Sequence, residues 1–337
     1  MAVKVAINGF GRIGRLVLRA IVESGREDVT CVAINDLGSV EASAHLFRYD
    51  TIHGRFPGVV EVAGDSITIR HQGRVYGPIK VSAERDPTKV PYQGVDVAME
   101  CTGIFTSKEK ASQLIQAGAR KVLISAPGDA VDATIVYGVN QATLTKEMTV
   151  VSNASCTTNC LVPMVKVLHD EWRVLRGYML TVHSYTGDQN TVDSLHKDPH
   201  RARAAGANLI PTSTGAARAV GLVMPELKGK LDGTSIRVPT PNVSLVSLDV
   251  MLERTPTKDA VNAAMKAASI GVLKGVMEYN TEPLVSSDFN HSPASCTFDA
   301  TQTAVVDGAM VRVMGWYDNE WGFSNRMSDT AALFGSL

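Results

Sequence analysis

A glycine-rich turn connects the first two predicted elements of this chain. Val3–Ile7 is a β-branched run typical of a strand, and Ile13–Ile21 carries apolar residues three and four positions apart, as a helix does. Between them begins the spacing G-x-G-x-x-G, formed by Gly9, Gly11 and Gly14. Such glycines permit a tight turn and let a pyrophosphate approach the backbone at the positive end of the helix. The pattern predicts a dinucleotide site in a parallel sheet, although a tight turn without a ligand would show the same glycines.

An acidic residue follows at the distance that such a site requires. A second strand-like run, Val29–Ile34, ends at Asn35 and Asp36, about 20 positions after the last glycine. A carboxylate there can accept hydrogen bonds from the adenosine ribose hydroxyls of NAD, and it repels the 2′-phosphate of NADP. We therefore expect NAD as the cofactor.

Strand and helix signals continue to alternate through the first half of the chain. Val95–Met99 and Lys121–Ser125 are predicted strands. The helix between them begins with the capping-box pair Thr106 and Glu109 and stops around Gly118. This alternation predicts a parallel sheet with helices on its faces.

The pattern changes after residue 150. Arg237–Arg254 and Val305–Tyr317 alternate apolar and polar residues, as half-buried antiparallel strands do. One helix is predicted to begin near Cys156 and to bend at Pro163, and another spans Ser324–Phe334. The expected fold class is α/β, with an N-terminal Rossmann-type parallel sheet followed by a C-terminal α+β domain built on a mostly antiparallel sheet.

Length and charge argue against several classes of protein. The 337 residues exceed what one core usually holds, which predicts two domains. A formal net charge of −1 gives no positive field for nucleic acid, and no apolar run approaches the roughly 20 residues of a membrane span. We therefore expect no membrane association and no nucleic acid as the main ligand. The basic cluster at residues 196–203 is interpreted as a solvated or subunit-facing loop.

The use of cysteine indicates a compartment. Five cysteines are an odd number without a repeating spacing, unlike a disulfide framework or a metal site. A strand already begins at Val3, which leaves no room for a signal peptide. We expect free thiols, no bound metal and a cytoplasmic protein.

One cysteine stands where a thiol can be activated. Cys156 is predicted to start a helix that Ser155 or a neighbour can cap, so that the positive helix end would favour the thiolate. A nucleophilic thiol also needs a basic neighbour, and His183, at the end of the strand-like run Tyr178–Val182, is the candidate. Spacing leaves the alternative open that Cys156 is a buried free thiol and His183 a core histidine. Cys160, one helical turn later, is interpreted as packing.

Together these residues resemble the glyceraldehyde-3-phosphate dehydrogenase family over essentially the whole chain. The resemblance rests on several motifs in order: INGFGRIGR (7–15), ECTG (100–103), SNASCTTNC (152–160), HSYTGDQ (183–189), TGAA (214–217), RVPTPNVS (237–244) and WYDNEWGFSNR (316–326). It implies a phosphorylating, NAD-dependent enzyme of glycolysis and gluconeogenesis. It also implies an NAD-binding Rossmann domain at 1–153, a catalytic and tetramerisation domain at 154–318, and a C-terminal helix at 319–337 that packs back on the first domain. The family is typically a homotetramer, with residues 185–208 against a neighbour's cofactor.

The resemblance implies a role for individual residues. Cys156 would be the nucleophile and His183 its base. Thr186 and Arg237 would hold the phosphate of glyceraldehyde 3-phosphate. The attacking inorganic phosphate would be held by Ser155, Thr157, Thr214 and Gly215. The cofactor positions would be Gly9, Phe10, Gly11, Arg12, Ile13, Gly14, Asp36, Thr102, Ser125 and Asn319, the last of which would bond the nicotinamide carboxamide.

The implied reaction runs through a thioester. Cys156 would add to the aldehyde, and His183 would take the proton as hydride leaves for the nicotinamide. Inorganic phosphate would then release the acyl group as 1,3-bisphosphoglycerate.

A sister family is the first alternative. Residues 316–326 and Asp288–His291 also resemble erythrose-4-phosphate dehydrogenases, which depart from the three-carbon enzymes around the phosphate sites. Here His183–Thr186 and Thr214–Ala217 match the three-carbon enzyme. Phe323 stands where many family members have a tyrosine, and we expect this change to have a small effect.

Two further alternatives belong to other classes. A semialdehyde dehydrogenase would share the cysteine–histidine chemistry, but it would be expected to use NADP and to lack the Thr186 phosphate contact. A redox-sensing or RNA-binding protein would be favoured by the loss of Cys156, His183 or Thr214, and all three are present.

Overall fold

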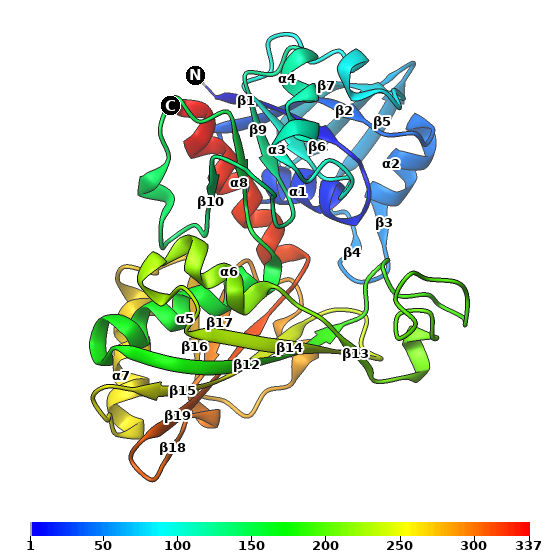
Figure 1. Ribbon diagram of the computed structural model, residues 1–337. Coiled ribbons are helices and arrows are strands. Elements are labelled where there is room, and N and C mark those ends of the chain that lie inside the picture. Colours follow the sequence, from blue (N-terminus) through cyan, green and yellow to red (C-terminus); the bar gives the residue numbers. More distant parts are fainter. Residues whose placement is uncertain (1) are drawn as a thin grey trace. The chain divides into compact units, whose positions relative to one another are not determined.

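Residues 2–337 are described by a computed structural model, in which the chain divides into two units (Figure 1). Unit 1 consists of the described residues up to Tyr137 together with Gln141–Ala154 and Ser324–Leu337. Unit 2 consists of Gly138–Asn140 and Ser155–Phe323. Each unit is built on its own sheet.

The sheet of unit 1 has the strand order β10-β11-β9-β8-β1-β2-β7-β6-β5. From β10 to β7 neighbouring strands run parallel, which confirms the Rossmann-type sheet predicted from the alternation of strands and helices. The parallel strands are β1 (Val3–Asn8), β2 (Val29–Asn35), β7 (Arg74–Ser82), β8 (Val97–Glu100), β9 (Lys121–Ile124), β10 (Ala133–Thr134) and β11 (Val150–Ser152).

The antiparallel edge of this sheet was not predicted. β5 (Val59–Ala63), β6 (Ser66–His71) and β7 form a meander, and β3 (Tyr49–Asp50) pairs with β4 (Gly54–Arg55). Sequence patterns predict no element between residues 37 and 94. β5 is only five residues long, and its sequence VVEVA places apolar residues on both faces of the strand, so it lacks the apolar–polar alternation of a half-buried strand.

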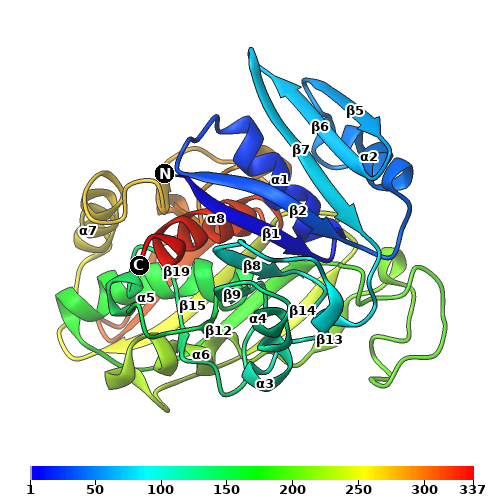
Figure 2. The same cartoon turned by 90° about the horizontal axis from the view of Figure 1, so that it is seen from above.

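Helices cover both faces of the parallel strands, with α1 and α8 on one side and α3 and α4 on the other (Figure 2). A Cβ atom at Gly335 of α8 would meet Val3 and Val97, whereas Leu114 of α4 shares a core with Ala98. Val97 and Ala98 serve opposite faces because successive residues of a strand point to opposite sides. The helices are α1 (Arg12–Glu23), α2 (Val40–Arg48), α3 (Lys108–Ala111), α4 (Gln113–Gln116) and α8 (Trp321–Ser336).

The helix predicted to open at Thr106 differs in two details. Its N-cap is Ser107, whose hydroxyl accepts a hydrogen bond from the backbone N–H of Lys110 at 3.3 Å. It is also divided into α3 and α4 at Ser112, where the serine hydroxyl donates to the carbonyl of Lys108 at 2.7 Å. Such local bonds compete with the regular helix pattern.

The sheet of unit 2 has the order β13-β14-β12-β15-β19-β17-β16, with β18 paired to β19. β12 and β14 are parallel, as are β16 and β17, and the other pairs are antiparallel, which confirms a mostly antiparallel sheet. The strands are β12 (Val174–Ser184), β13 (Ile210–Thr212), β14 (Leu231–Val238), β15 (Ser244–Leu252), β16 (Met277–Asn280), β17 (Cys296–Asp299), β18 (Ala304–Val306) and β19 (Met310–Tyr317).

Helix α5 packs on the sheet of unit 2, against β12, β15, β17 and β19. Alternate residues of β15 are buried, as the sequence pattern predicts for a strand with one covered face. The helices of this unit are α5 (Cys156–Trp172), which continues through Pro163, α6 (Ala216–Val223) and α7 (Lys258–Ile270). Across residues 2–337, no helix has the length and apolar character to cross a membrane.

Candidate functional site

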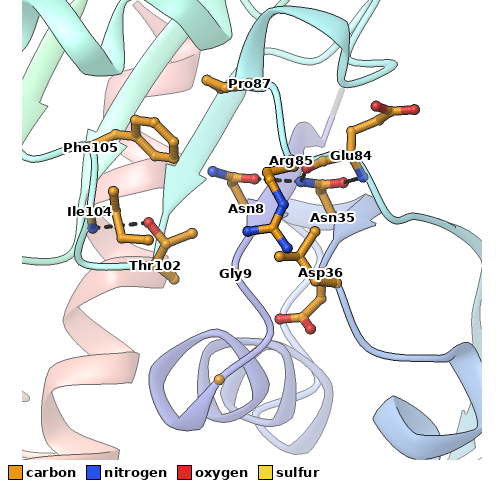
Figure 3. Close-up of a pocket in the computed structure, with 13 residues that line it drawn as sticks. Asn8, Gly9, Asn35, Asp36, Glu84, Arg85, Pro87, Thr102, Ile104 and Phe105 are labelled. Atoms are coloured by element: carbon orange, nitrogen blue, oxygen red, sulfur yellow. Dashed lines mark hydrogen bonds between the residues drawn. The ribbon is translucent and has the colours of Figure 1, made fainter.

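A cavity of about 480 Å³ in unit 1 opens at the carboxyl ends of β1, β2 and β8 (Figure 3). This edge of a parallel sheet is where ligands bind in open α/β folds. Four residues expected to bind the cofactor line the cavity: Gly9, Gly11, Asp36 and Thr102. The other lining residues are Asn8, Asn35, Leu37, Glu84, Arg85, Pro87, Cys101, Ile104 and Phe105.

The glycine turn is shaped for a close backbone approach. Gly9 has φ of +92°, and a Cβ atom there would lie 2.7 Å from the backbone nitrogen of Thr102. At Gly14 a Cβ atom would lie 2.1 Å from the carbonyl oxygen of Gly9. Gly11 is the N-cap of α1, has no side chain to cap it, and has no atom within 4 Å of its Cβ position. The turn therefore presents the uncapped N-terminus of α1 to the cavity, which fits a pyrophosphate.

Asp36 lies beside this turn at the end of β2. One carboxylate oxygen accepts a hydrogen bond from the backbone N–H of Phe10 at 2.7 Å, and the other accepts from Gly38 at 2.9 Å. Each carboxylate oxygen has a further lone pair, so the group can still accept hydrogen bonds from ribose hydroxyls.

The structure places the remaining cofactor candidates of unit 1 outside the cavity lining. The Phe10 ring is buried and stacks on Phe47, so only its backbone faces Asp36. The Arg12 guanidinium pairs with Asp50, and together with backbone hydrogen bonds it outweighs burial and holds the pKa of that carboxyl at about 2. Ile13, Gly14 and Ser125 are not among the lining residues either.

A buried polar network that the sequence analysis missed supports the floor of the cavity. Asn35 donates to the side-chain oxygen of Asn8 at 2.9 Å, and Asn8 donates to Glu100 at 2.6 Å (Figure 3 shows the first bond). Glu100 is 1% exposed, burial raises the pKa of its carboxyl, and it accepts from the backbone N–H of Thr102 at 2.8 Å. The available signal was a polar residue at the end of each of three strands.

In unit 2, the local sequence places Cys156 at the first position of α5. The preceding Ala154 takes the left-handed conformation with φ of +59°, which turns the chain into the helix. Ser155 is the N-cap, and its hydroxyl oxygen accepts a hydrogen bond from the backbone N–H of Thr158 at 3.1 Å. The sequence-based prediction of a capped helix beginning at Cys156 is confirmed.

The structure brings Cys156 and His183 together. The sulfur lies 3.5 Å from Nε2 of His183, which stands near the end of β12 and is 4% exposed. Nδ1 of His183 lies 2.7 Å from the carbonyl oxygen of Ser184. A proton on Nδ1 can be donated to that carbonyl, which leaves Nε2 bare to accept a proton from the sulfur.

The pKa shifts of this pair do not favour the thiolate that the helix start predicts. Burial raises the pKa of the Cys156 thiol, although Arg237 and Thr157 act in the opposite direction. Burial and then the positive charge of Arg237 lower the pKa of His183 to about 3. Burial is the largest influence on both groups, and it favours the uncharged thiol and the uncharged imidazole.

Arg237 lies against the other edge of the imidazole. Its Nη1 donates to the carbonyl oxygen of Ser184 at 3.0 Å and lies 2.8 Å from Nδ1 of His183, so in the tautomer with the proton on Nδ1 this carbonyl accepts from both nitrogens. Its Nε atom is buried and has no hydrogen-bond partner within residues 2–337. A buried donor without a partner can be satisfied by an anion that enters the site.

The hydroxyls expected to bind phosphate have various partners. Thr157 Oγ1 lies 2.9 Å from the Tyr317 hydroxyl, and Thr186 Oγ1 lies 3.3 Å from Oε1 of Gln189. Thr214 accepts from the backbone N–H of Ala216 at 3.2 Å, at the start of α6. The neighbouring Gly215 is the N-cap of α6 and has no atom within 4 Å of its Cβ position.

The structure adds Arg201 to the charged groups near Arg237. Arg201 pairs with Asp188, and its Nη2 donates to the carbonyl of Ser213 at 3.5 Å. The positive charge of Arg201 and the negative charge of Asp188 both act on the pKa of Arg237, which burial lowers. The sequence of this basic stretch by itself indicates only a solvated or subunit-facing loop.

Asn319 follows β19, and two hydrogen bonds to its side-chain oxygen fix the orientation of its amide. Its Oδ1 accepts hydrogen bonds from the hydroxyls of Ser184 at 2.8 Å and Ser244 at 2.9 Å, so the amide NH₂ is the group left to meet a ligand. The preceding Asp318 accepts from the backbone N–H groups of the next turn. Phe323 is 4% exposed, so its ring fills buried space.

No group of three or more metal-ligating side chains stands together in the described part of the chain. All five cysteines are unpaired thiols.

Comparison with known proteins gives full-length matches. The sequence matches the family described as glyceraldehyde 3-phosphate dehydrogenase, NAD binding domain, over residues 3–108, and glyceraldehyde 3-phosphate dehydrogenase, C-terminal domain, over residues 155–319. It is 64% identical over 337 residues to a glyceraldehyde-3-phosphate dehydrogenase of Cereibacter sphaeroides, covering 100% of both chains. The identity is 62% over 339 residues to that of Xanthobacter flavus, again over 100% of both chains. To that of Geobacillus stearothermophilus it is 53% over 339 residues, covering 100% of this chain and 99% of the relative.

Proposed function

The chain belongs to the glyceraldehyde 3-phosphate dehydrogenase family, and we propose that it oxidises D-glyceraldehyde 3-phosphate to 1,3-bisphosphoglycerate, with NAD and inorganic phosphate, in glycolysis and gluconeogenesis. The observation that carries the proposal is the 3.5 Å approach of the Cys156 sulfur to Nε2 of His183. A thiol within reach of a bare imidazole nitrogen is what thioester chemistry requires.

The first step forms the carbon–sulfur bond. As the Cys156 sulfur attacks the aldehyde carbon, Nε2 of His183 accepts the thiol proton and returns it to the aldehyde oxygen, which gives a hemithioacetal. The low pKa of His183 makes its imidazolium a strong acid, suited to returning this proton.

The second step is oxidation. NAD, when bound, supplies the acceptor for the hydride of the hemithioacetal carbon. Nε2 of His183 removes the hydroxyl proton as the hydride leaves, so that the carbon–oxygen double bond of a thioester re-forms. Inorganic phosphate then attacks the thioester, and the departing sulfur regains its proton from His183.

Two groups of residues are proposed for the phosphates. Thr186 and the buried, unpartnered Nε of Arg237 would hold the substrate phosphate. The attacking phosphate would be held by Ser155, Thr157, Thr214 and Gly215, with Arg201 as a second guanidinium near Arg237. Thr157 would have to exchange its contact with Tyr317 for this role.

The cofactor would use mainly the backbone of the glycine turn. Gly9, Phe10, Gly11, Arg12, Ile13 and Gly14 would hold the pyrophosphate at the N-terminus of α1, and Asp36 the adenosine ribose. Thr102 and Ser125 would be further cofactor contacts. The amide NH₂ of Asn319 would donate to the nicotinamide carboxamide.

Assembly as a homotetramer is part of the proposal. Residues 185–208 would lie against a neighbour's cofactor, and this stretch with the adjoining loop exposes large apolar side chains: Val192, Leu195 and Leu209. Exposed apolar side chains in one segment are typical of a protein interface. A cytoplasmic location is also proposed, because a reducing compartment keeps cysteines as the unpaired thiols seen here.

One assay tests the activity. Absorbance at 340 nm should rise with glyceraldehyde 3-phosphate, NAD and phosphate together, and much more slowly when phosphate is omitted or NADP replaces NAD. A rate independent of phosphate would reject the phosphorylating reaction. Light scattering after size-exclusion chromatography should give the mass of four chains.

A further inference from the structure

Three buried hydroxyls of unit 2 are connected by two hydrogen bonds. The hydroxyl of Tyr317 lies 2.9 Å from Oγ1 of Thr157 and 2.9 Å from Oγ1 of Thr181. Thr157 follows Cys156 in the first turn of α5, Thr181 belongs to β12, and Tyr317 ends β19. The three residues are 5%, 1% and 2% exposed in the order Thr157, Thr181, Tyr317, so bulk water does not compete for these contacts.

Cys156 directly precedes Thr157 in α5. Burial raises the pKa of the Cys156 thiol, whereas Arg237, and after it Thr157 through both its hydroxyl and its backbone N–H, lower it. Thr157 directly follows Cys156 in α5 and its hydroxyl contacts that of Tyr317, so it connects the nucleophile to the buried hydroxyls of Tyr317 and Thr181.

The direction of these hydrogen bonds follows from counting protons. A thiolate only accepts, so the Thr157 hydroxyl must donate to it. The Thr157 oxygen can then accept from Tyr317, and the Tyr317 oxygen can accept from Thr181. In this direction every hydroxyl proton has an acceptor, and each bond polarises the next. Burial raises the pKa of the Tyr317 phenol, so it keeps the proton that it donates.

We propose that Thr181, Tyr317 and Thr157 form a hydroxyl relay that directs the Thr157 proton to the Cys156 sulfur, and that Tyr317 and Thr181 are positioning residues of the nucleophile. The inference rests on the proposed function in one respect, the role of Cys156. It gives the Thr157 hydroxyl a partner in the ligand-free protein other than inorganic phosphate.

Other groups also act on this sulfur. They are His183 from β12, Arg237 from β14 and Cys160 from α5. The Tyr317 ring also packs edge-on against the His183 ring, with centroids 5.9 Å apart and an interplanar angle of 82°. The informative change is therefore Tyr317→Phe, which keeps the ring beside His183 and removes only the hydroxyl.

The test is the pH dependence of Cys156 alkylation by iodoacetamide in the full-length, ligand-free protein, with the modified residue identified by mass spectrometry. Tyr317→Phe should raise the midpoint by about 0.5–1 pH unit, which lowers the rate roughly three- to tenfold below the midpoint. Thr181→Val should shift it in the same direction by less. Thr157→Val should shift it at least as far as Tyr317→Phe, and Thr157→Ser should keep the parent midpoint.

The double variant decides whether Tyr317 acts through Thr157. Tyr317→Phe should have no further effect in a Thr157→Val background, and an equal shift in both backgrounds would overturn the relay. Unchanged midpoints in Tyr317→Phe and Thr181→Val would also overturn it. Tyr279→Phe, which removes a phenol elsewhere in unit 2, is the matched control and should behave as the parent.

Turnover of the same samples separates this inference from the proposed function. If Cys156→Ser abolishes phosphate-dependent turnover while Tyr317→Phe leaves the alkylation midpoint unchanged, the relay alone is rejected. If Cys156→Ser retains turnover, the nucleophile is misassigned whatever the alkylation data show.

Discussion

His183 of β12 and Arg237 of β14 are register partners in adjacent parallel strands, and Nη1 of Arg237 lies 2.8 Å from Nδ1 of His183. A permanent cation at this distance, added to burial, opposes a second positive charge on the imidazole. Burial and this cation therefore favour the neutral form of His183. Arg237, which is proposed to hold the substrate phosphate, thus also lowers the pKa of the residue that moves the proton.

The identity of the nucleophile is tested by Cys156→Ser. We expect the variant to fold and bind NAD while its phosphate-dependent turnover falls by more than a thousandfold, because a serine hydroxyl is far less nucleophilic than a thiol at this site. NAD binding by calorimetry and turnover at 340 nm check both parts. Cys160→Ser changes a buried thiol one turn away and is the control. Turnover within tenfold of the parent would remove Cys156 from the mechanism.

The depressed pKa of His183 predicts a stability loss in acid. Between pH 6.5 and about 3 the unfolded chain binds a proton at this histidine that the folded chain does not. The contribution of His183 to the free energy of unfolding is thus fully present above pH 6.5. It declines by about 1.4 kcal/mol per pH unit as the pH falls below that value.

Urea unfolding at pH 6.5 and pH 5 measures this effect. The parent should lose about 2 kcal/mol more than His183→Asn over this interval. His200→Asn, which changes an exposed histidine, should follow the parent. The same loss in His183→Asn as in the parent would show that the imidazole is protonated in the folded state. Turnover of His183→Asn should fall by about 10²–10⁴.

The choice of cofactor should depend on Asp36. A 2′-phosphate near this carboxylate would meet a repulsion of roughly 3 kcal/mol per unit charge at 5 Å with an effective dielectric of 20. Screening reduces the value, but the parent should still favour NAD over NADP by well over tenfold in kcat/KM. Asp36→Ala should reduce that ratio, and Glu61→Ala, an exposed change in the same unit, should not. Equal efficiency with both cofactors in the parent would mean that Asp36 does not face the ribose.

The preferred chain length of the aldehyde substrate should depend on where its phosphate is bound. Thr186 and Arg237 would grip it at a fixed distance from Cys156, and erythrose 4-phosphate has one more carbon between phosphate and aldehyde. A misplacement of about 1 Å can cost about 10²-fold in rate, so glyceraldehyde 3-phosphate should be preferred at least about a hundredfold in kcat/KM. Arg237→Leu should erase most of the preference, and Arg218→Leu, which removes an exposed arginine, should not. Better turnover of erythrose 4-phosphate by the parent would establish the sister activity instead.

Local sequence was sufficient for features that depend on neighbouring residues. The glycine turn, the helix start at Cys156 with its Ser155 cap, and the strand–helix alternation of unit 1 are set by steric limits, capping and periodicity over a few positions. A short strand without apolar–polar alternation, such as β5, was not predicted.

The tertiary structure decided which residues from distant parts of the chain lie together. Spacing left open whether His183 faces Cys156, and the register of β12 with β14 sets it beside Arg237. Burial raises the pKa of the Cys156 thiol, against the shift expected at a helix start, and the fold brings the Thr157 hydroxyl to within 2.9 Å of Tyr317, 160 residues away. Desolvation and hydrogen-bond partners depend on everything packed around a group, so short-range sequence patterns do not contain them.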